Sequence, residues 1–317
     1  MRGKIWAVGV LIAVSLILFT CTNFGSPNRS RLVIATTTST VDGGLLEYLK
    51  PHFDARFGAE MTWLYLGSGQ AFAVASRGDA DILLVHDRER EDAFMVAGNG
   101  THRITVMYND FVIIGPTTDA AGVRGAADAL EAFKKIAEAG ESGVARFVSR
   151  GDKSGTHTLE MRIWSTLGVE PRKKVWYIEA GQGMSATIRI CSEKQAYTLS
   201  DRGTWVKLRN SLGEALKLQI LYEYDKKLLN PYGLILLNQQ KYPNINSELA
   251  EKFFLFMISD EGQKLIDSYR VANEQLFFSA FGKAEVIGLP SEQEEVQFWV
   301  RRLLESGLEP PSWLKPG

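Results

Sequence analysis

The spacing of apolar residues divides the first third of the chain into repeating units. Apolar runs at 31–38, 61–66 and 80–86 have the length of buried strands. Polar loops and then apolar residues at helical spacing follow the first two runs, and the charged tract 87–92 after the third is typical of a solvated helix surface. This repeat of strand, loop and helix predicts an α/β fold.

Two longer apolar runs indicate two lobes. The run 106–116 and the run after Asn230 are long enough to cross between lobes, and helices and strands lie between them. We therefore expect an α/β protein of two lobes, each a mixed sheet flanked by helices, with the two crossing strands as the hinge. The expected limits are 32–115 with 226–285 for lobe 1, 116–225 for lobe 2, and 286–317 for a C-terminal extension that forms an amphipathic helix on the body and a loose end.

Residues 1–30 have the composition of a signal peptide and tether. Basic residues precede an apolar run from Ile5 to Phe19, which is shorter than the ~20 residues of a membrane-spanning helix. Cys21 stands where a lipoprotein signal places its modified cysteine, but Phe19 and Thr20 match that pattern poorly, so lipidation stays open. We expect an exported protein, periplasmic or anchored to the outer face of the cytoplasmic membrane.

Composition narrows the function. The net charge is −1, and loss of Arg2 and Lys4 with the signal lowers it to about −3, so a nucleic-acid surface is not indicated. Cys21 and Cys191 are too few for a disulfide framework or a cysteine metal site. We expect a monomer with no cofactor and no cation site.

The segment 147–160, FVSRGDKSGTHTLE, carries the strongest chemical signal. Arg150 is a permanent cation, and Ser154, Thr156 and the backbone N–H groups around Gly155 are neutral donors. Ser154 and Thr156 are also N-cap residue types, and a helix start presents free N–H groups and the positive end of its dipole. The segment predicts an anion site.

Other loops repeat these donors. Each follows a predicted strand, at the edge where open α/β sheets bind ligands. They are Thr38 and Ser39 in the first loop and Ser68 in the second, with Thr37, Gly69, Gly183 and Met184 as weaker candidates. If the lobes close on each other, neutral donors from both sides can surround a small ion, with Arg150 as the only full charge. His86, at a strand end, fits a local hydrogen-bonding role.

The donor set limits the ligand. A fully deprotonated tungstate, molybdate or sulfate suits an all-donor site, whereas a protonated phosphate gains from a carboxylate that accepts its proton. Asp152 lies close enough in sequence to keep phosphate open.

A series of motifs resembles the tungstate-binding proteins of ABC importers. The likeness covers roughly 32–238, weakens to about 281, and rests on these stretches: ATTTSTVDGGLL, LGSGQAFAVASRGDADILLVH, VMYNDFVIIGP, FVSRGDKSGTHTLE, WYIEAGQGMSATI, EKQAYTLSDRGTW and LLNPYG. The resemblance implies a type II periplasmic-binding-protein fold that captures tungstate or molybdate. It also implies delivery to a membrane permease with a cytoplasmic ATPase.

The resemblance also assigns site residues. The family's TTTS loop matches Thr36 to Ser39, its glycine-flanked hydroxyl matches Ser68, where threonine is usual, and its arginine and SGT match Arg150 and 154–156. Asp87 and Arg88 replace a usually uncharged pair, and the chain beyond about 286 departs from the family.

Two other classes of function are weighed. A hydrolase would use Ser154 with His157, but the sequence supplies no acidic residue to orient the histidine, so we expect no enzyme. A ligand sensor would use the same lobe closure.

Overall fold

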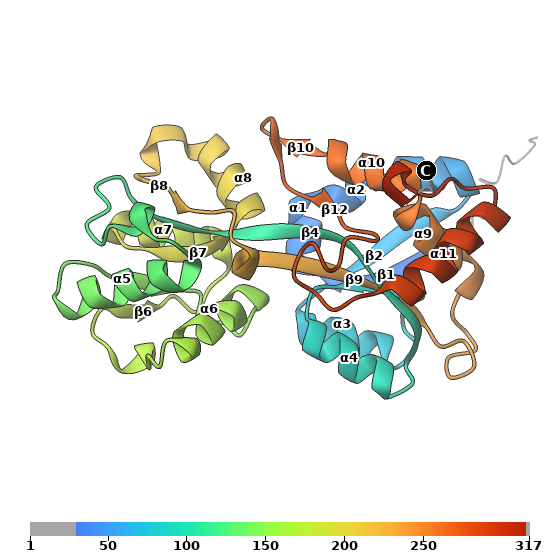
Figure 1. Cartoon of the computed structure of the whole chain (residues 1–317), viewed down its shortest axis with the longest axis horizontal. Helices are drawn as coiled ribbons and strands as arrows, with labels where there is room; N and C mark the ends of the chain where they lie inside the picture. The colour runs from blue at the N-terminus through green and yellow to red at the C-terminus, as the bar shows by residue number, and fades with distance from the viewer. Residues whose placement is uncertain (1–29, 315–317) are drawn as a thin grey trace, which may run out of the picture.

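The computed structural model describes residues 30–314 and has two lobes side by side (Figure 1). Lobe 1 is built on the strands of the N-terminal repeats, and its elements are β1 (Arg31–Thr37), α1 (Thr38–Gly43), α2 (Leu45–Phe57), β2 (Glu60–Leu66), α3 (Ser68–Ala75), β3 (Ile82–Val85), α4 (Arg88–Val96), α9 (Ser247–Ile258), α10 (Asp260–Ser268), β10 (Arg270–Val271), β11 (Glu274–Gln275) and β12 (Phe278–Ser279). Lobe 2 contains α5 (Ala129–Glu141), β5 (Phe147–Ser149), α6 (Gly155–Thr166), β6 (Tyr177–Glu179), α7 (Met184–Lys194), β7 (Thr198–Asp201), α8 (Arg202–Leu212) and β8 (Leu218–Tyr222).

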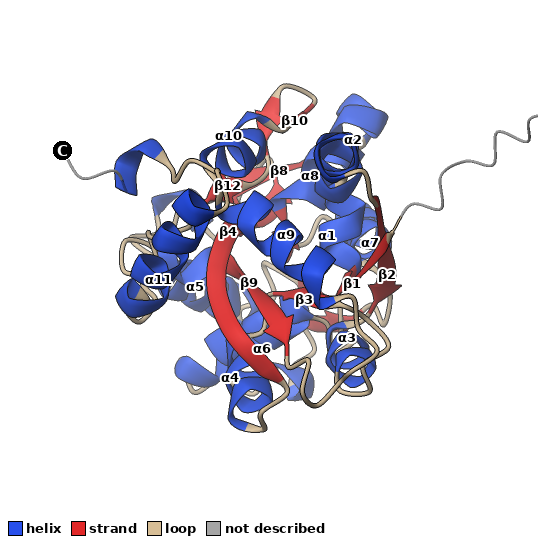
Figure 2. Ribbon diagram, turned by 90° about the vertical axis from the view of Figure 1, so that its right-hand side faces the viewer, coloured by secondary structure: helices blue, strands red, loops and turns tan. Residues whose placement is uncertain are grey.

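The sheet of lobe 1 is mixed and covered on both faces. Its strands lie in the order β12-β4-β9-β3-β1-β2, where β4 is Gly100–Pro116 and β9 is Leu229–Leu237, and β1 runs parallel to β2 and β3. Leu32 and Ile34 of β1 pack in the core that α2 and α9 complete, while Ala35 packs in the core under α3. Figure 2 shows these helices on opposite sides of the sheet. Burial on both faces explains why the strand sequences are continuously apolar.

The long strand β4 (Gly100–Pro116) belongs to both lobes. Its first part, up to Asp110, pairs with β9 in lobe 1, and its last part, from Phe111, pairs with β7 and β8 in lobe 2. The predicted crossing strand is therefore confirmed for this segment. The second predicted crossing strand corresponds to β9, which follows a short 3-10 turn, Lys226–Leu228, and runs beside β4 from Leu229, opposite Asp110, onward.

The first predicted loop is wrong in one respect. We expected strand, polar loop and helix, but the hydroxyl cluster ends β1 at Thr37 and then continues directly as the short helix α1. Gly44 ends α1 in the left-handed conformation with φ 81°, and α2 starts at the next residue. Thr37 is the N-cap of α1, a residue type common at helix starts, although its hydroxyl contacts Thr40 Oγ1 and does not cap a backbone N–H group.

The C-terminal segment lies on lobe 1, and its end is not loose up to Leu314. The expected amphipathic helix is α11 (Gln293–Glu305), whose buried Trp299 packs against Phe254 with a ring-centroid distance of 4.3 Å. Glu292, just before α11, accepts hydrogen bonds from the Thr105 backbone N–H and Oγ at 2.9 Å each, and from Arg103. Trp313 Nε1 donates to the Phe281 carbonyl oxygen at 3.0 Å. Buried polar contacts of this kind fix the segment.

Candidate anion-binding site

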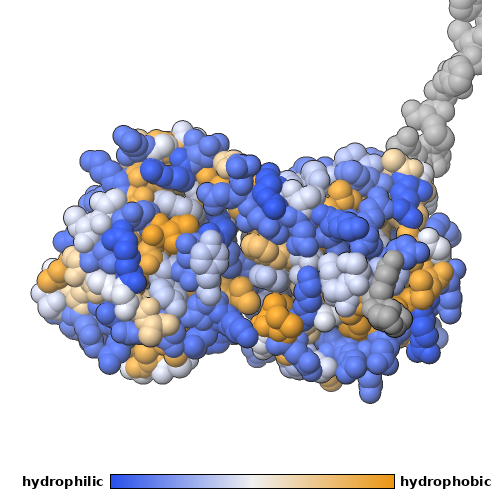
Figure 3. Space-filling model, turned by 45° about the horizontal axis from the view of Figure 1, so that its top comes forward, coloured by the Kyte–Doolittle hydropathy of each residue, from blue (hydrophilic) through white to orange (hydrophobic). Residues whose placement is uncertain are grey.

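A cleft of about 700 Å³ lies between the lobes. The space-filling view shows the surface drawn in at this waist (Figure 3). Lobe 1 and β9 contribute Thr37, Gly67, Gly69, Gln70, His86, Arg90 and Asn230, and β4 and lobe 2 contribute Phe111, Arg150, Asp152, Lys153, Ser154, Gly155, Thr156 and Asp201. Six residues predicted from the sequence therefore meet in one cleft: Thr37, Gly69, Arg150, Ser154, Gly155 and Thr156.

The start of helix α6 forms the lobe 2 side of the cleft. Ser154 is its N-cap, and Ser154 Oγ accepts a hydrogen bond from the His157 backbone N–H at 3.4 Å. Thr156 is buried in the first turn. The turn before the helix is tight because Gly151 and Lys153 both take left-handed backbone conformations, with φ 63° and 60°. This turn aims the free N–H groups of the helix start into the cleft.

Arg150 is held by the neighbouring Asp152. Its Nε and Nη2 donate to Asp152 Oδ2 at 3.0 and 2.5 Å, while Asp152 Oδ1 accepts the Ser154 backbone N–H at 3.1 Å. Burial raises the pKa of Asp152, but hydrogen bonds from Ser154 and the charge of Arg150 outweigh it and lower that pKa below its usual value. Both carboxylate oxygens are thus occupied, and Asp152 offers little to a protonated ligand.

The lobe 1 side of the cleft starts at the end of β1. Thr37 is buried, and its Oγ1 lies 3.0 Å from Thr40 Oγ1. The backbones of Thr38 and Ser39 open helix α1, and the backbone of Ser68 opens α3, which places three predicted residues at two helix starts. Their side chains lie outside what the structure describes.

The two lobes touch at His86 and Gly155. A Cβ atom built on Gly155 would lie 2.8 Å from His86 Cε1, so a glycine is needed for this approach. The ring of His86 lies 4.9 Å from the ring of Tyr232, and burial lowers the pKa of His86 to about 4. His86 is therefore neutral near pH 7 and forms part of the cleft wall, which its position at a strand end did not reveal.

The interpretation of 87–92 as solvated surface is wrong for Glu91, whereas Arg90 is exposed as expected but also borders the cleft. Glu91 is 1% exposed and pairs with Arg103, and Arg90 lines the cleft. Arg150 is also not the only cation, because Lys153 lines the cleft as well. A run of charged residues indicates that the segment favours water. Which of its side chains face the cleft or the core depends on the direction in which α4 leaves the sheet. Its start beside the carboxyl end of β3 is the signal that could have found Arg90.

Two of the weaker candidates, Gly183 and Met184, lie outside the described cleft lining. Gly183 caps α7 and Met184 opens it, but neither is among the described residues that line the cleft, and the Met184 side chain is buried in the core. Packing of α7 against the sheet turns this side chain inward. Cys191 is a buried free thiol, and burial raises its pKa. Cys21 lies outside the described residues.

Ser154 and His157 are not arranged as a nucleophile and its base. Ser154 Oγ accepts from the backbone of His157, and His157 Nδ1 accepts the Lys153 backbone N–H at 2.9 Å. Burial and the nearby charge of Arg172 lower the pKa of His157. The imidazole stabilises the loop 151–157 and does not face the serine hydroxyl as an acceptor.

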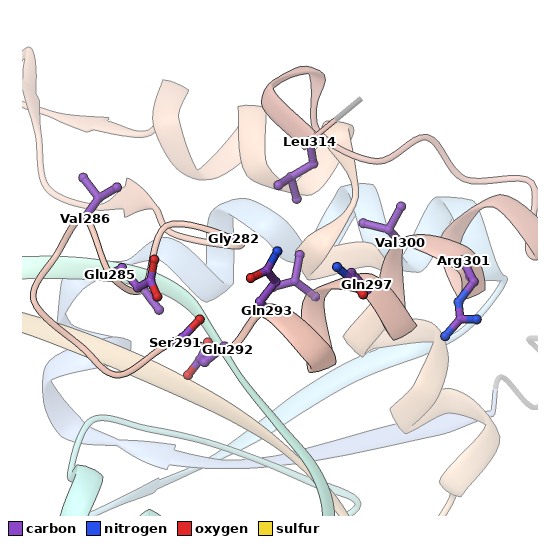
Figure 4. Close-up of a pocket in the computed structure, with 12 residues that line it drawn as sticks. Gly282, Glu285, Val286, Ser291, Glu292, Gln293, Gln297, Val300, Arg301 and Leu314 are labelled. Carbon is purple, nitrogen blue, oxygen red and sulfur yellow. The ribbon is translucent and has the colours of Figure 1, made fainter. Parts of the chain in front are cut away.

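Two other hollows fit an anion less well. One of about 700 Å³ lies beside α11, where Glu285 and Glu292 bring negative charge (Figure 4). The other, of about 490 Å³, borders the cleft; Arg88, Arg103 and Lys227 there pair with carboxylates, Arg162 and Lys226 also line it, and it contains one of the predicted donors, Gly155. The cleft between the lobes remains the candidate site.

Comparisons with known proteins agree with this architecture. Residues 23–261 match the model of a PBP superfamily domain. The chain is 41% identical over 243 residues to the tungstate-binding protein TupA of Peptoclostridium acidaminophilum, covering 76% of this chain and 82% of that protein. The chain belongs to the TupA family. The crystal structures of two TupA-type relatives extend the likeness to three dimensions.

The solved TupA of Desulfovibrio alaskensis G20 is 43% identical with a TM-score of 0.73, covering 79% of this chain and 98% of that one. The tungstate ABC transporter protein of Geobacter sulfurreducens is 44% identical with a TM-score of 0.65, covering 75% and 98%. This chain therefore spans almost the whole length of both proteins, while about a fifth of it lies outside the first match and a quarter outside the second. Within residues 30–314, no helix has the length and apolar character to cross a membrane.

Proposed function

We propose that this chain captures tungstate in the cleft between its lobes and delivers it to an ABC importer. The observation that carries the proposal is the convergence of Arg150 with Ser154, Thr156 and Thr37 from opposite lobes on one cleft. Dehydrating a dianion is costly unless its oxygens are bonded again, and donors from both lobes can do this once the lobes close. The names of the TupA relatives support tungstate as the ion.

The remaining site residues belong to the same proposal. The N–H groups and hydroxyls at the start of α1, from Thr38 and Ser39, and at the start of α3, from Ser68 and Gly69, complete the shell. Asp152 positions Arg150 and does not contact the ion. No catalysis follows binding, because the relatives are binding proteins and Ser154 and His157 do not form a catalytic pair.

The proposed cellular role follows from membership of the TupA family. We infer an exported monomer, held outside the cytoplasmic membrane by its N-terminal segment or free in the periplasm, that docks on a permease and its ATPase. The lobe limits 32–115 with 226–285 and 116–225 belong to this proposal, with β4 and the turn before β9 as the hinge.

Isothermal titration with four oxyanions tests the function. The protein is titrated with tungstate, molybdate, sulfate and phosphate in one buffer. Tight one-to-one binding of tungstate with much weaker sulfate and phosphate is expected, and the ratio to molybdate defines the selectivity. Stronger binding of phosphate, or no binding of any of the four ions, contradicts the proposal.

A further inference from the structure

Arg150 is not the only cation in the cleft. Arg90, Arg150 and Lys153 all line it, against two carboxylates, Asp152 and Asp201. Asp152 is bound to Arg150, and Asp201 Oδ1 accepts the Thr204 backbone N–H at 2.7 Å as the N-cap of α8. The side chain of Arg150 is only 17% exposed, and its charge is paired with the carboxylate of Asp152. Arg150 therefore attracts an ion in the cleft more than an ion in the surrounding solvent.

Arg90 is more exposed than Arg150 and lies on the other lobe. It lies in the first turn of α4 in lobe 1, and its side chain is 52% exposed. Within residues 30–314 it makes one ion pair, in which Nη1 donates to Asp87 Oδ2 at 2.5 Å. A guanidinium has five N–H groups, so this contact orients Arg90 and leaves donors for a ligand.

Lys153 is the counterpart on lobe 2. It is exposed, and among residues 30–314 its ammonium group makes no ion pair. Its φ of 60° is unusual for a residue with a side chain. The conformation is held because the Lys153 N–H donates to the ring of the buried His157. A strained position maintained in a ligand-lining loop points to a function of that residue.

We propose that Arg90 and Lys153 are capture cations, one on each lobe, which draw the dianion into the cleft and set its rate of association. The inference rests on the proposed oxyanion binding and names how that site is filled. Exposed charges attract an ion over a distance of about one Debye length, roughly 10 Å at 0.1 M salt, and a cleft with low-dielectric walls focuses this attraction. Their effect therefore lies in the association rate and weakens with salt.

The test compares two double variants of equal net charge. R90Q/K153Q removes the proposed cations, while R77Q/K134Q removes one exposed cation from each lobe outside the described cleft lining. A third variant, R90K/K153R, keeps both charges. Each protein is mixed with tungstate in a stopped-flow instrument, and tryptophan fluorescence follows binding at about 20 mM and about 500 mM NaCl.

At low salt, we expect R90Q/K153Q to associate roughly tenfold more slowly than the unmodified protein, with its dissociation rate changed less than about twofold. At high salt the difference should shrink to about twofold or less. R77Q/K134Q and R90K/K153R should retain the original rates.

An equal loss of association rate in R77Q/K134Q would overturn the inference, because net charge alone would then explain it. An unchanged association rate in R90Q/K153Q, with tungstate still bound, would overturn the inference and leave the proposed function standing. If the unmodified protein binds none of the four oxyanions by titration, both fail.

Discussion

The contact between His86 and Gly155 gives the sharpest test of lobe closure. In Gly155→Ala, the new methyl group would lie 2.8 Å from His86 Cε1 and 3.4 Å from Nδ1. The ring cannot move away freely because it packs against Tyr232. Overpacking of this kind costs about 1–3 kcal/mol. The two residues come from opposite lobes, and we expect bound tungstate to hold the lobes in this contact, so the cost falls on the bound form and the dissociation constant for tungstate should rise about 5- to 150-fold.

Stability should change in the opposite direction. Gly155 is the first residue of α6 and does not need a left-handed conformation, so alanine there favours the helix by up to about 1 kcal/mol. The open, ligand-free form gains this stabilisation without the clash. We therefore expect the melting temperature of the ligand-free variant to stay equal or rise while tungstate binding weakens.

Titration calorimetry and thermal melts of the same samples measure both effects. Gly125→Ala is the matched control, because a Cβ there meets no atom within 4 Å and its φ is not left-handed. An affinity for tungstate within twofold of the original protein would refute the reasoning, since the lobes could then not approach this closely around the ion. A lower melting temperature would instead place the clash within the ligand-free fold.

Three further predictions concern single side chains. Arg150→Gln should weaken tungstate binding by about 1.5–3 kcal/mol, against about 0.5–1.5 for Thr156→Val, because a charge-assisted hydrogen bond is about twice as strong as a neutral one; calorimetry compares them. Burial raises the pKa of Glu160 to about 7, so the protonated form is favoured in the folded state. The protonated form stabilises the fold fully below pH 4.5, and this stabilisation, about 3 kcal/mol in all, is lost as the pH rises through 7. In Glu160→Gln the free energy of unfolding should no longer fall over this pH range, which denaturant unfolding at several pH values measures. Glu292→Ala should lower the free energy of unfolding by about 3 kcal/mol, because it leaves buried Arg103 and the Thr105 backbone N–H short of a partner.

A specific result would contradict each of these three predictions. Equal affinity in Arg150→Gln would make that arginine structural. A parallel pH profile in Glu160→Gln would show that Glu160 titrates near its ordinary pKa. Exposed Glu294, in the first turn of the same helix, is the control for Glu292, and equal effects of the two alanine substitutions would show that the buried network adds nothing.

Much of the fold follows from local sequence. The apolar runs that become β1 and β3 are confirmed as strands because burial on both faces demands continuous apolar sequence, and the run of β2 is confirmed as a partly buried edge strand. Ser154 is confirmed as the cap of α6 for an equally local reason, since its hydroxyl bonds an N–H three residues later. The run 106–116 is confirmed as a crossing strand because its length exceeds what one lobe can pair.

Only the tertiary structure determines the direction in which the side chains face. Arg90 and Glu91 are neighbours in one charged tract, yet one lines the cleft and the other is buried against Arg103. The contact of His86 with Gly155 joins lobes that are separate in the pattern of strands and helices. Sequence periodicity encodes whether a position meets water or core, because that preference belongs to the residue itself. Which distant residue it meets depends on how helices and lobes pack, and no local pattern contains that information.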